Sequence, residues 1–234
     1  EYFLKKITIL IPAYNEEATI LDILKAVSAQ SIDGIRLEVI VVDDGSKDRT
    51  VELLEANPEL YTKLIKQPRN GGKGAAVKAG MQVATGEYIL FQDADLEYNP
   101  ADYKQLMLPI LQFDADVVMG SRFLAPEFVR VSYFWHKIGN YVITFVFNIF
   151  NNTTFTDVYS CYLMFRSTLV DAEKLQTEGW EQHAEILSKA VDVSKSIYEV
   201  PVSYRGRTYE EGKKIRAHHV ISVIWTIVRM RFLR

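Results

Sequence analysis

The stretch that decides the fold is residues 88–97, YILFQDADLE, in which a short apolar run is followed at once by acidic side chains. The apolar run has the length and composition of a buried β-strand. Asp93, Asp95 and Glu97 then stand at alternate positions. Residues two apart on an extended backbone point the same way and lie roughly 6 to 7 Å apart, so Asp93 and Asp95 can face one ligand. Because bare carboxylates this close repel each other, the pattern predicts a site shared by a divalent cation and an anionic substrate.

Outward from this stretch, strand-like and helix-like segments alternate along the first half of the chain. The apolar runs predicted as strands are 7–11, 37–42, 64–65, 88–91 and 116–119. The segments with helical periodicity or capping residues are 16–30, about 46–56, 71–84 (a glycine-rich loop leading into a helix) and 100–113. Regular alternation of this kind is typical of a largely parallel, doubly wound sheet, whose ligands bind beyond the carboxyl ends of the strands.

After Arg122 this alternation stops. Residues 123–155 are rich in aromatic side chains and contain no clear strand. A strand at 161–165, a helix at 181–191, a strand at 196–204 and a final apolar helix complete the chain. We find no internal repeat, low-complexity tract or clear linker, so the sequence predicts one continuous unit.

The composition narrows the class of protein. A chain of 234 residues with 48% hydrophobic residues can bury a substantial core as one large domain. The formal charge of −3 and the lack of an unbroken basic run argue against a nucleic-acid partner. The one cysteine, Cys161, excludes an intrachain disulfide and a Cys-rich zinc site, in keeping with a reducing compartment. The first residues lack the apolar stretch of a signal peptide, so we expect a cytoplasmic protein.

Two apolar segments, 142–150 and 220–228, raise the question of a membrane. Neither reaches the roughly 18 to 20 residues that span a bilayer. The second segment contains Trp225 and is followed by three arginines within 229–234, a mixture suited to a helix on an anionic lipid surface. A helix that covers a large sheet needs the same apolar face, so interfacial contact and core packing both stay open.

Several short motifs occur along the chain in a specific order. They are IPAYNEE at 11–17, VVDDGSKD at 41–48, NGGKGA at 70–75, DAD at 93–95, GSRF at 120–123, TD at 156–157 and RTYEEGKK at 207–214. In this order and spacing the chain resembles family 2 glycosyltransferases of the GT-A fold, most closely the dolichyl-phosphate and polyprenyl-phosphate sugar synthases. The resemblance implies an α/β fold with a Rossmann-like, mostly parallel sheet flanked by helices, and apolar surface helices in the C-terminal half.

The same resemblance implies an inverting, metal-dependent glycosyltransferase. It would move a hexose from a nucleoside-diphosphate sugar, of the GDP-mannose or UDP-glucose type, to a polyprenyl phosphate. We expect a catalytic domain over 1–214, with a nucleotide-binding half to about residue 122 and an acceptor half over 123–214, and a C-terminal amphipathic helix over 215–234. We expect the protein to be bound peripherally to the cytoplasmic face of a membrane. Whether it forms an oligomer or associates with a separate membrane subunit stays open.

The resemblance assigns the nucleotide sugar to a crevice formed by Pro12, Ala13, Tyr14, Glu16, Asp43, Lys73 and Asp93. Pro12 ends its strand, so a flat base can rest against the loop that follows. Glu16 would reach the ribose hydroxyls, and Asp43 would accept an N–H that uracil and guanine both carry. Taken alone, Glu16 also favours a helix N-terminus and the Asp-Gly pair after Asp43 makes a turn, so a purely structural role stays open for each.

The glycine-rich segment 70–74 lacks the Gly-Lys-Ser/Thr ending of a Walker phosphate loop, which argues against an ATPase. Its glycines allow the backbone to approach a ligand, and the helix that follows offers its N-terminal amides to phosphate. Lys73 is predicted to neutralise that phosphate. The alternative is a flexible turn with a solvated lysine.

For the metal, the resemblance implies that Asp95 binds Mg²⁺ or Mn²⁺ bridging the diphosphate and that Asp93 contacts the nucleotide sugar. Glu97 stands where related synthases often have glutamine and is an additional candidate ligand. Oxygen ligands suit these hard cations better than zinc. A cation placed there stabilises the charge on the departing diphosphate, and a single displacement at the anomeric carbon inverts its configuration.

The acceptor decides whether a general base is needed. A lipid monophosphate is mostly a dianion at neutral pH and is already a nucleophile. Basic residues should then surround it, and the candidates are Arg122, Arg130, Arg207 and Lys213. The predicted catalytic set is Asp93, Asp95, Arg122, Asp157 and Arg207.

A sugar hydroxyl of a polysaccharide or a soluble acceptor would instead need a base, for which Asp157 and Glu185 are the candidates. A nucleotide-binding module without turnover and a nucleotidyltransferase are the remaining alternatives.

Overall fold

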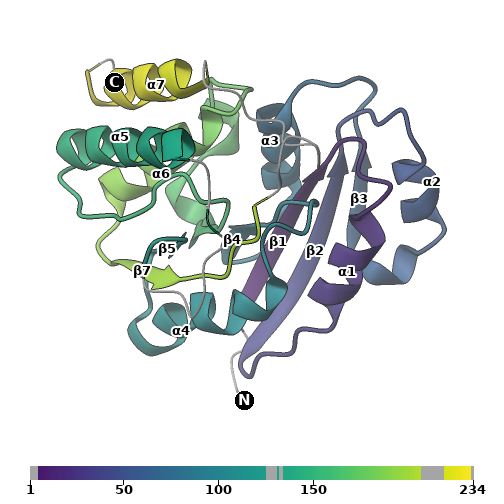
Figure 1. Ribbon diagram of the computed structural model, residues 1–234. Helices are drawn as coiled ribbons and strands as arrows, with labels where there is room; N and C mark the ends of the chain where they lie inside the picture. Colours follow the sequence, from purple (N-terminus) through teal and green to yellow (C-terminus); the bar gives the residue numbers. More distant parts are fainter. Residues whose placement is uncertain (1–4, 125–130, 132–133, 207–218, 233–234) are drawn as a thin grey trace.

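The computed structural model describes residues 5–124, 131, 134–206 and 219–232. In this part of the chain a central sheet has the strand order β3-β2-β1-β4-β6-β5-β7 (Figure 1). The strands are β1 Lys5–Ala13, β2 Ile35–Asp43, β3 Lys63–Lys66, β4 Tyr88–Phe91, β5 Val117–Ser121, β6 Leu163–Arg166 and β7 Ile197–Pro201. Neighbouring strands are parallel except at β6, which is antiparallel to both β4 and β5. The predicted mostly parallel α/β sheet is therefore confirmed.

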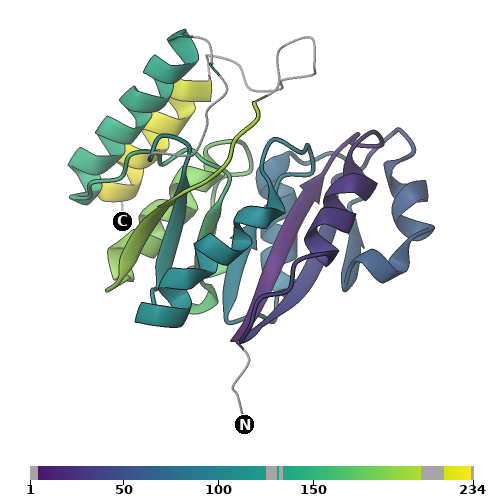
Figure 2. The ribbon, with the colours of Figure 1, turned by 60° about the horizontal axis from the view of Figure 1, so that its bottom comes forward.

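Helices cover both faces of this sheet. They are α1 Ile20–Ser28, α2 Thr50–Glu55, α3 Lys73–Val83, α4 Tyr103–Phe113, α5 Phe134–Asn151, α6 Gln182–Val193 and α7 His219–Phe232, with short 3₁₀ turns η1 Pro58–Leu60, η2 Pro100–Asp102, η3 Ser167–Leu169 and η4 Ala172–Lys174. In Figure 2, α1 and α4 lie in front of the sheet, whereas α3 and α6 lie behind it. The molecule is thus a sandwich of helix, sheet and helix, as two-sided burial of parallel strands requires.

The central strands are apolar because they are covered on both faces. Ile7, Ile9, Leu10 and Ile11 of β1 have no solvent-exposed surface. Thr8 lies among them, and its hydroxyl donates to the buried carboxylate of Glu38 on β2 at 2.6 Å. A nearly continuous apolar run of this kind is expected of a strand inside a parallel sheet.

Glu38 is the centre of a buried polar cluster that ties three segments together. Its carboxylate also accepts from Lys6 Nζ at 2.7 Å and from the backbone N–H of Thr85, which precedes β4, at 2.9 Å. Burial alone would raise the pKa of Glu38, but these hydrogen bonds lower it to about 2. The carboxylate is therefore charged and paired at neutral pH, and it links β1, β2 and the start of β4.

The position of the functional site follows from the order of the strands. From β1 the chain proceeds through β2 to β3 on one side, and α3 then carries it back to β4 on the other side of β1. The direction of winding therefore changes between β1 and β4. In doubly wound sheets, ligands bind at this change, outside the carboxyl ends of the strands.

Helix α1 begins at Ile20, four residues later than the predicted start at Glu16. The backbone N–H groups of Asn15 and Glu17 donate to Ser46 and Asp48 of the β2–α2 loop, and that of Glu16 donates to Thr50, the first residue of α2. Asn15 has a positive φ of 52°, so the chain turns sharply there. The helix therefore starts later than predicted, because the turn at Asn15 and the contacts with the β2–α2 region fix residues 15–17 in a non-helical path.

Helices α5 and α7 lie side by side at one end of the sheet (Figures 1 and 2). They contain the two apolar segments noted in the sequence, and α7 also packs on α6. Outward-facing side chains of α5 include Phe145 and Ile149, which are 66% and 60% exposed. No helix among the described residues is both long and apolar enough to cross a membrane.

Candidate active site

A cavity of about 620 Å³ opens at the carboxyl ends of β1 and β4. Its lining includes Pro12, Ala13, Tyr14, Glu16, Lys73, Asp93, Asp95, Glu97 and Arg122, all predicted site residues. Asp43 lines an adjacent cavity that shares Tyr14 with the first. Asp157 is fully buried behind Arg122, and Arg130, Arg207 and Lys213 lie outside the described residues. The structure thus brings most of the predicted residues to one place.

The β2–α2 turn is held by adjacent carboxylates with different partners. Asp43 Oδ2 accepts from the N–H groups of Gly45 and Ser46, both at 3.1 Å. Its other oxygen, Oδ1, is buried and has no hydrogen-bond partner among the described residues. Asp44 instead accepts from the N–H groups of Gly71 and Gly72, both at 2.9 Å, and so fixes the glycine-rich segment. Burial raises the pKa of Asp44, which these bonds partly offset.

The glycine-rich segment has a packing role that the sequence did not reveal. The N–H of Gly74 donates to the carbonyl of Glu178 at 2.8 Å, and a Cβ at Gly74 would overlap Glu178. Gly72 has a positive φ of 92°, which glycine adopts without strain. Glycine at position 74 therefore allows close packing against the segment before α6. Its N–H is hydrogen-bonded within the protein, so it does not bind a phosphate.

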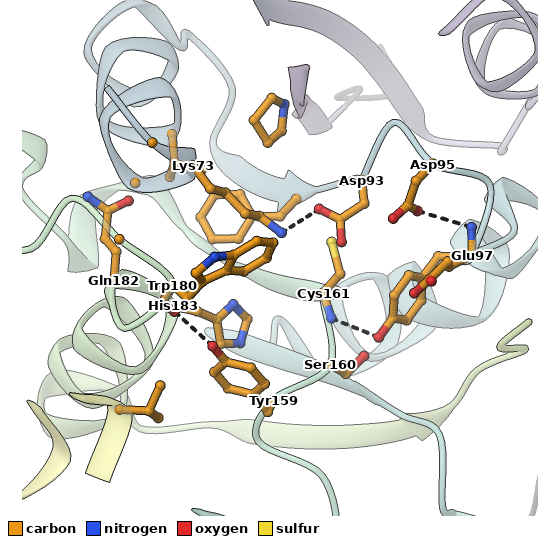
Figure 3. A pocket seen from close by; sticks show the side chains of 18 of the residues that line it. Lys73, Asp93, Asp95, Glu97, Tyr159, Ser160, Cys161, Trp180, Gln182 and His183 are labelled. Atoms are coloured by element: carbon orange, nitrogen blue, oxygen red, sulfur yellow. Dashed lines mark hydrogen bonds and ion pairs between the residues drawn. The ribbon is translucent and has the colours of Figure 1, made fainter. Parts of the chain in front are cut away.

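The Lys73 side chain lines the cavity, and its ammonium forms an ion pair with Asp93 (Figure 3). Burial opposes the charge on Lys73, but the charge of Asp93 raises its pKa. Burial likewise acts against charge on Asp93, and Lys73 lowers the pKa of that carboxyl. The ammonium also lies 5.3 Å from the centre of the Trp180 ring, a cation–π distance. Lys73 is thus a fixed positive charge next to the carboxylates that follow β4.

The backbone before Asp93 is held by buried Gln92. The Gln92 amide donates to the Asp93 carbonyl at 3.0 Å, and its oxygen accepts from the hydroxyls of Tyr103 and Tyr162, both at 2.8 Å. All the polar atoms of this amide side chain therefore have protein partners. The network fixes the point at which the acidic loop leaves the strand.

Asp95 and Glu97 lie on the same loop and line the same cavity (Figure 3). Asp95 Oδ1 accepts from the backbone N–H of Glu97 at 3.1 Å, and Glu97 Oε2 accepts from the Tyr204 hydroxyl at 2.9 Å. No group of three or more His, Cys, Asp or Glu side chains in the described part of the chain forms a complete metal cage. One or two carboxylates fit Mg²⁺, which usually takes its other ligands from water and substrate phosphates.

Arg122 is held rigidly at the edge of the cavity. Its Nε and Nη2 donate to the two oxygens of Asp157 at 2.7 and 2.8 Å, and its backbone N–H also donates to Asp157. The guanidinium lies 5.0 Å from the centre of the Tyr204 ring. Burial disfavours the charge on Arg122, but Asp157 raises its pKa well above the ordinary value. This bidentate pair presents a permanent cation of fixed orientation.

Behind Asp157, Glu199 of β7 holds the loop in place. Its carboxylate accepts from the N–H groups of Thr156 and Asp157 at 2.9 to 3.0 Å, and from the Thr156 hydroxyl at 2.9 Å. Burial raises the pKa of Glu199, and the hydrogen bonds from Thr156 act in the opposite direction. Sequence reasoning missed Glu199 because nothing near it in the chain indicates its partners.

The far wall of the cavity carries polar atoms without protein partners. Ser160 Oγ, Gln182 Oε1 and His183 Nε2 are buried and have no hydrogen-bond partner among the described residues. Burial and the nearby Lys73 lower the pKa of His183 to about 4, so its ring is neutral at physiological pH. Buried polar atoms are normally paired, so these atoms mark positions where ligand hydroxyl groups can bind. The sequence did not single out Ser160 or Gln182.

Comparison with protein families matches residues 8–172 to Glycosyl transferase family 2. The dolichol-phosphate mannosyltransferase of Pyrococcus furiosus is 28% identical over 223 residues, which cover 90% of this chain and 60% of that protein. The dolichyl-phosphate beta-glucosyltransferase of Dictyostelium discoideum is 30% identical over 250 residues, covering 97% and 74%. An uncharacterized protein of Methanocaldococcus jannaschii is 34% identical over 120 residues, 48% of this chain and 50% of its own length. The chain therefore spans between half and three quarters of the length of these relatives.

Solved structures share the fold at low sequence identity. Glucosyl-3-phosphoglycerate synthase from Mycobacterium tuberculosis, solved with Mn²⁺, uridine diphosphate and phosphoglyceric acid, has a TM-score of 0.70 at 19% identity, covering 97% of this chain and 79% of that one. S. aureus TarS has a TM-score of 0.62 at 18% identity, covering 97% and 72%. These likenesses confirm the predicted GT-A type of fold. Since the family match covers more than half of its residues, the chain belongs to glycosyl transferase family 2.

Proposed function

We propose that the protein is an inverting hexosyltransferase that moves a sugar from a nucleoside diphosphate to a polyprenyl-type lipid phosphate. The observation that carries the proposal is the composition of one cavity. Carboxylates for a cation, the Lys73 ammonium and the Arg122 guanidinium line it together with apolar side chains of α5 and α7. A polar, charged end next to an apolar wall matches two phosphate-bearing substrates, one of which carries a hydrocarbon chain.

For the donor, the residues fit a nucleoside diphosphate held with Mg²⁺ or Mn²⁺. Asp95, with Glu97 beside it, would hold the cation, which when bound stabilises the negative charge that develops on the departing diphosphate. Lys73 adds a positive charge on the same side of the cavity, while Asp93 keeps that ammonium oriented. The unpartnered Gln182 and Ser160 oxygens are suitable acceptors for hydroxyl groups of the sugar.

For the acceptor, Arg122 is the one arginine or lysine besides Lys73 among the described residues that line the cavity. Its pairing with Asp157 fixes the guanidinium plane, and planar guanidinium groups bind phosphate in defined orientations. Ile143 of α5 and Val223 of α7 also line the cavity and give this part of its lining an apolar character. A lipid monophosphate would then lie with its charge at Arg122 and its hydrocarbon chain against these two helices.

The geometry around the candidate bases favours a phosphate acceptor over a sugar hydroxyl. Both Asp157 oxygens accept from Arg122. Glu185 is fully buried and accepts from the backbone of Gln176 and Thr177, and from Lys189 at 2.8 Å. Since each carboxylate is engaged with protein donors, neither is poised to take a proton from a hydroxyl. A phosphate dianion needs no such base.

The outer faces of α5 and α7 support contact with a membrane surface. Phe145, Ile221 and Trp225 are between 62% and 73% exposed on these helices. Arg231 is exposed in the last turn of α7, whereas Arg229 in the same turn donates to the Gln176 side chain at 2.9 Å. Aromatic and apolar side chains beside arginines are suited to the boundary of an anionic bilayer. A lipid acceptor would enter the cavity from that boundary.

Product analysis tests this function directly. The protein is incubated with UDP-glucose or GDP-mannose, Mg²⁺ or Mn²⁺, and either a short polyprenyl phosphate or a soluble sugar acceptor. We expect a glycosylated lipid phosphate that extracts into organic solvent and is identified by mass spectrometry. Sugar transfer to the soluble acceptor alone would establish the hydroxyl-acceptor alternative. Absence of transfer in every combination, with the protein folded, would contradict the proposal.

A further inference from the structure

We propose that the base site of this chain selects uracil over guanine, so that the donor is a uridine-diphosphate sugar. The inference rests on the proposed function and concerns the identity of its donor. The observation behind it is that the carboxylate at the base site offers one oxygen to a ligand. An acceptor at Asp43 is compatible with both bases. The structure shows in addition which of the two carboxylate oxygens is still available to accept from a ligand.

The turn at Asp43 occupies one of the two oxygens of its carboxylate, Oδ2. Oδ2 accepts from the N–H groups of Gly45 and Ser46, which occupies the two lone pairs of that oxygen. Gly45 has a positive φ of 72°, and a Cβ there would lie 2.7 Å from the carbonyl carbon of Arg69. The turn is therefore closely packed against the neighbouring loop, and Oδ2 stays committed to it.

The other oxygen is the one left for a ligand. Asp43 is 2% exposed, and its Oδ1 is buried without a hydrogen-bond partner among the described residues. Asp43 also lines the cavity of about 540 Å³ next to the phosphate end of the main cavity. A buried carboxylate oxygen without a partner is costly, so an N–H from a ligand at this position is strongly favoured.

The surroundings of Asp43 are rich in donors. The charged residues that line this cavity besides Asp43 are Lys47, Lys66 and Arg69, so Asp43 is the one carboxylate among the described lining residues. The side-chain oxygens of Ser46 and Asn70 already accept from the N–H groups of Asn15 and Gly72. Among the described side chains that line this cavity, Asp43 is therefore the single charged acceptor; Gln67 adds a neutral amide, and Lys66 is paired with Glu55 at 2.5 Å.

Uracil and guanine differ in what they offer to such a site. The polar edge of uracil carries one N–H, at N3, between two carbonyl oxygens. The edge of guanine carries one carbonyl oxygen followed by two adjacent donors, N1–H and the N2 amino group. One charged acceptor oxygen complements the single N–H of the uracil edge, whereas guanine would leave its amino group without a charged acceptor. A site rejects a base most strongly when binding leaves a polar group unpaired.

Nucleotide binding tests the inference. Isothermal titration calorimetry in the presence of Mg²⁺ or Mn²⁺ compares UDP, GDP and CDP on the complete chain. We expect UDP to bind about tenfold to a hundredfold more tightly than GDP, the range set by one hydrogen bond to a charged group. Equal or tighter binding of GDP overturns the base assignment and leaves the proposed function standing, whereas no binding of any nucleotide overturns both.

A substitution at the carboxylate sharpens the test. In Asp43→Asn, the amide oxygen can still accept from Gly45 and Ser46, which turns the NH₂ group towards the base. Uracil N3–H then faces a donor, whereas cytosine presents an acceptor at N3, so the preference should move from UDP to CDP. Glu52→Gln, at an exposed ion pair on α2, is the control and should keep the wild-type order. An Asp43→Asn protein that is folded and retains the wild-type order would refute the assignment.

Discussion

At the scale of single residues, the proposed chemistry depends most on the Asp95 carboxylate. Replacing it by alanine removes the carboxylate proposed to hold the cation, and we expect sugar transfer to fall by roughly a hundredfold or more. Transfer is measured with labelled nucleotide sugar, with and without EDTA. The wild type should lose activity in EDTA and regain it on adding Mg²⁺ or Mn²⁺. Wild-type turnover by Asp95→Ala in EDTA would disprove the cation's role.

Glu199 acts on the site from a distance. Glu199→Gln weakens the hydrogen bonds that this side chain accepts from the N–H groups of Thr156 and Asp157, so the loop that orients Arg122 becomes less rigid. We expect a loss of about 1 to 3 kcal/mol in the free energy of unfolding and a lower turnover rate, with UDP binding unchanged. Urea denaturation, steady-state kinetics and calorimetry measure the three quantities. If Glu199→Gln matches the exposed control Glu52→Gln in all of them, Glu199 has no positioning role.

The site residues differ in how far the sequence could predict them. Asp93 and Asp95 could be placed because they follow directly on a strand, but the extended backbone expected for them is not found, since residues 94–97 form a turn in which Leu96 has a positive φ of 60°. Glu199 lies 42 residues beyond Asp157 in the chain, and their hydrogen bond exists because β7 pairs with β5. No local pattern encodes such a contact. The same is true of the partnerless Oδ1 of Asp43, which depends on how a neighbouring turn packs.

At the scale of elements, the Glu38 cluster makes the union of β1, β2 and the start of β4 sensitive to acid. The folded-state pKa of about 2 lies below the ordinary value of 4.5, so the charged carboxylate stabilises the fold above pH 4.5. That contribution, about 3 kcal/mol, is lost as the pH falls from 4.5 towards 2. Urea denaturation should show wild type well above Glu38→Gln in stability at pH 7, with the difference narrowing below pH 4.5. A difference that is constant with pH would contradict this account.

The docking of α3 depends on Gly74. A methyl group there would meet the Glu178 carbonyl, so we expect Gly74→Ala to lower the free energy of unfolding by about 1 to 3 kcal/mol. Gly139 in α5 is the matched control, because the nearest atom to its added Cβ is Val220 Cγ2 at 3.9 Å. Gly139→Ala should raise stability by about 0.5 to 1 kcal/mol through helix propensity. Thermal denaturation distinguishes the two, and equal effects of both changes would refute the packing argument.

Among the elements, the parallel strands and their helices could be predicted from apolar runs and periodicity. The direction of β6 could not, because a buried strand has the same composition whether its neighbours run parallel or antiparallel to it. The start of α1 was missed for a different reason. The chain turns at Asn15, which has a positive φ, and the N–H groups of Glu16 and Glu17 are held by Thr50 and Asp48, contacts that sequence spacing alone does not show.

At the scale of the whole molecule, α5 and α7 form the surface proposed to meet a bilayer. Phe145→Asp and Trp225→Asp each place a charge at a position more than 60% exposed, so the fold should survive. Each should weaken sedimentation with vesicles of phosphatidylcholine and phosphatidylglycerol by about tenfold, since each removes one large apolar contact. Leu108→Asp on α4, away from these helices, is the control and should bind as wild type does. Equal binding by all variants, or none by the wild type, would exclude this surface.

The insertion of β6 has a consequence for how the chain is made. Strands β4 and β5 precede β6 in the sequence, yet in the described part of the sheet β6 lies between them and pairs with both. A nascent chain that has not yet been synthesised past Arg166 therefore carries two strands with unpaired edges inside its later core. The two portions of the sheet can join only after the ribosome has delivered that reversed strand, and β7, which comes later still, then pairs with the other edge of β5.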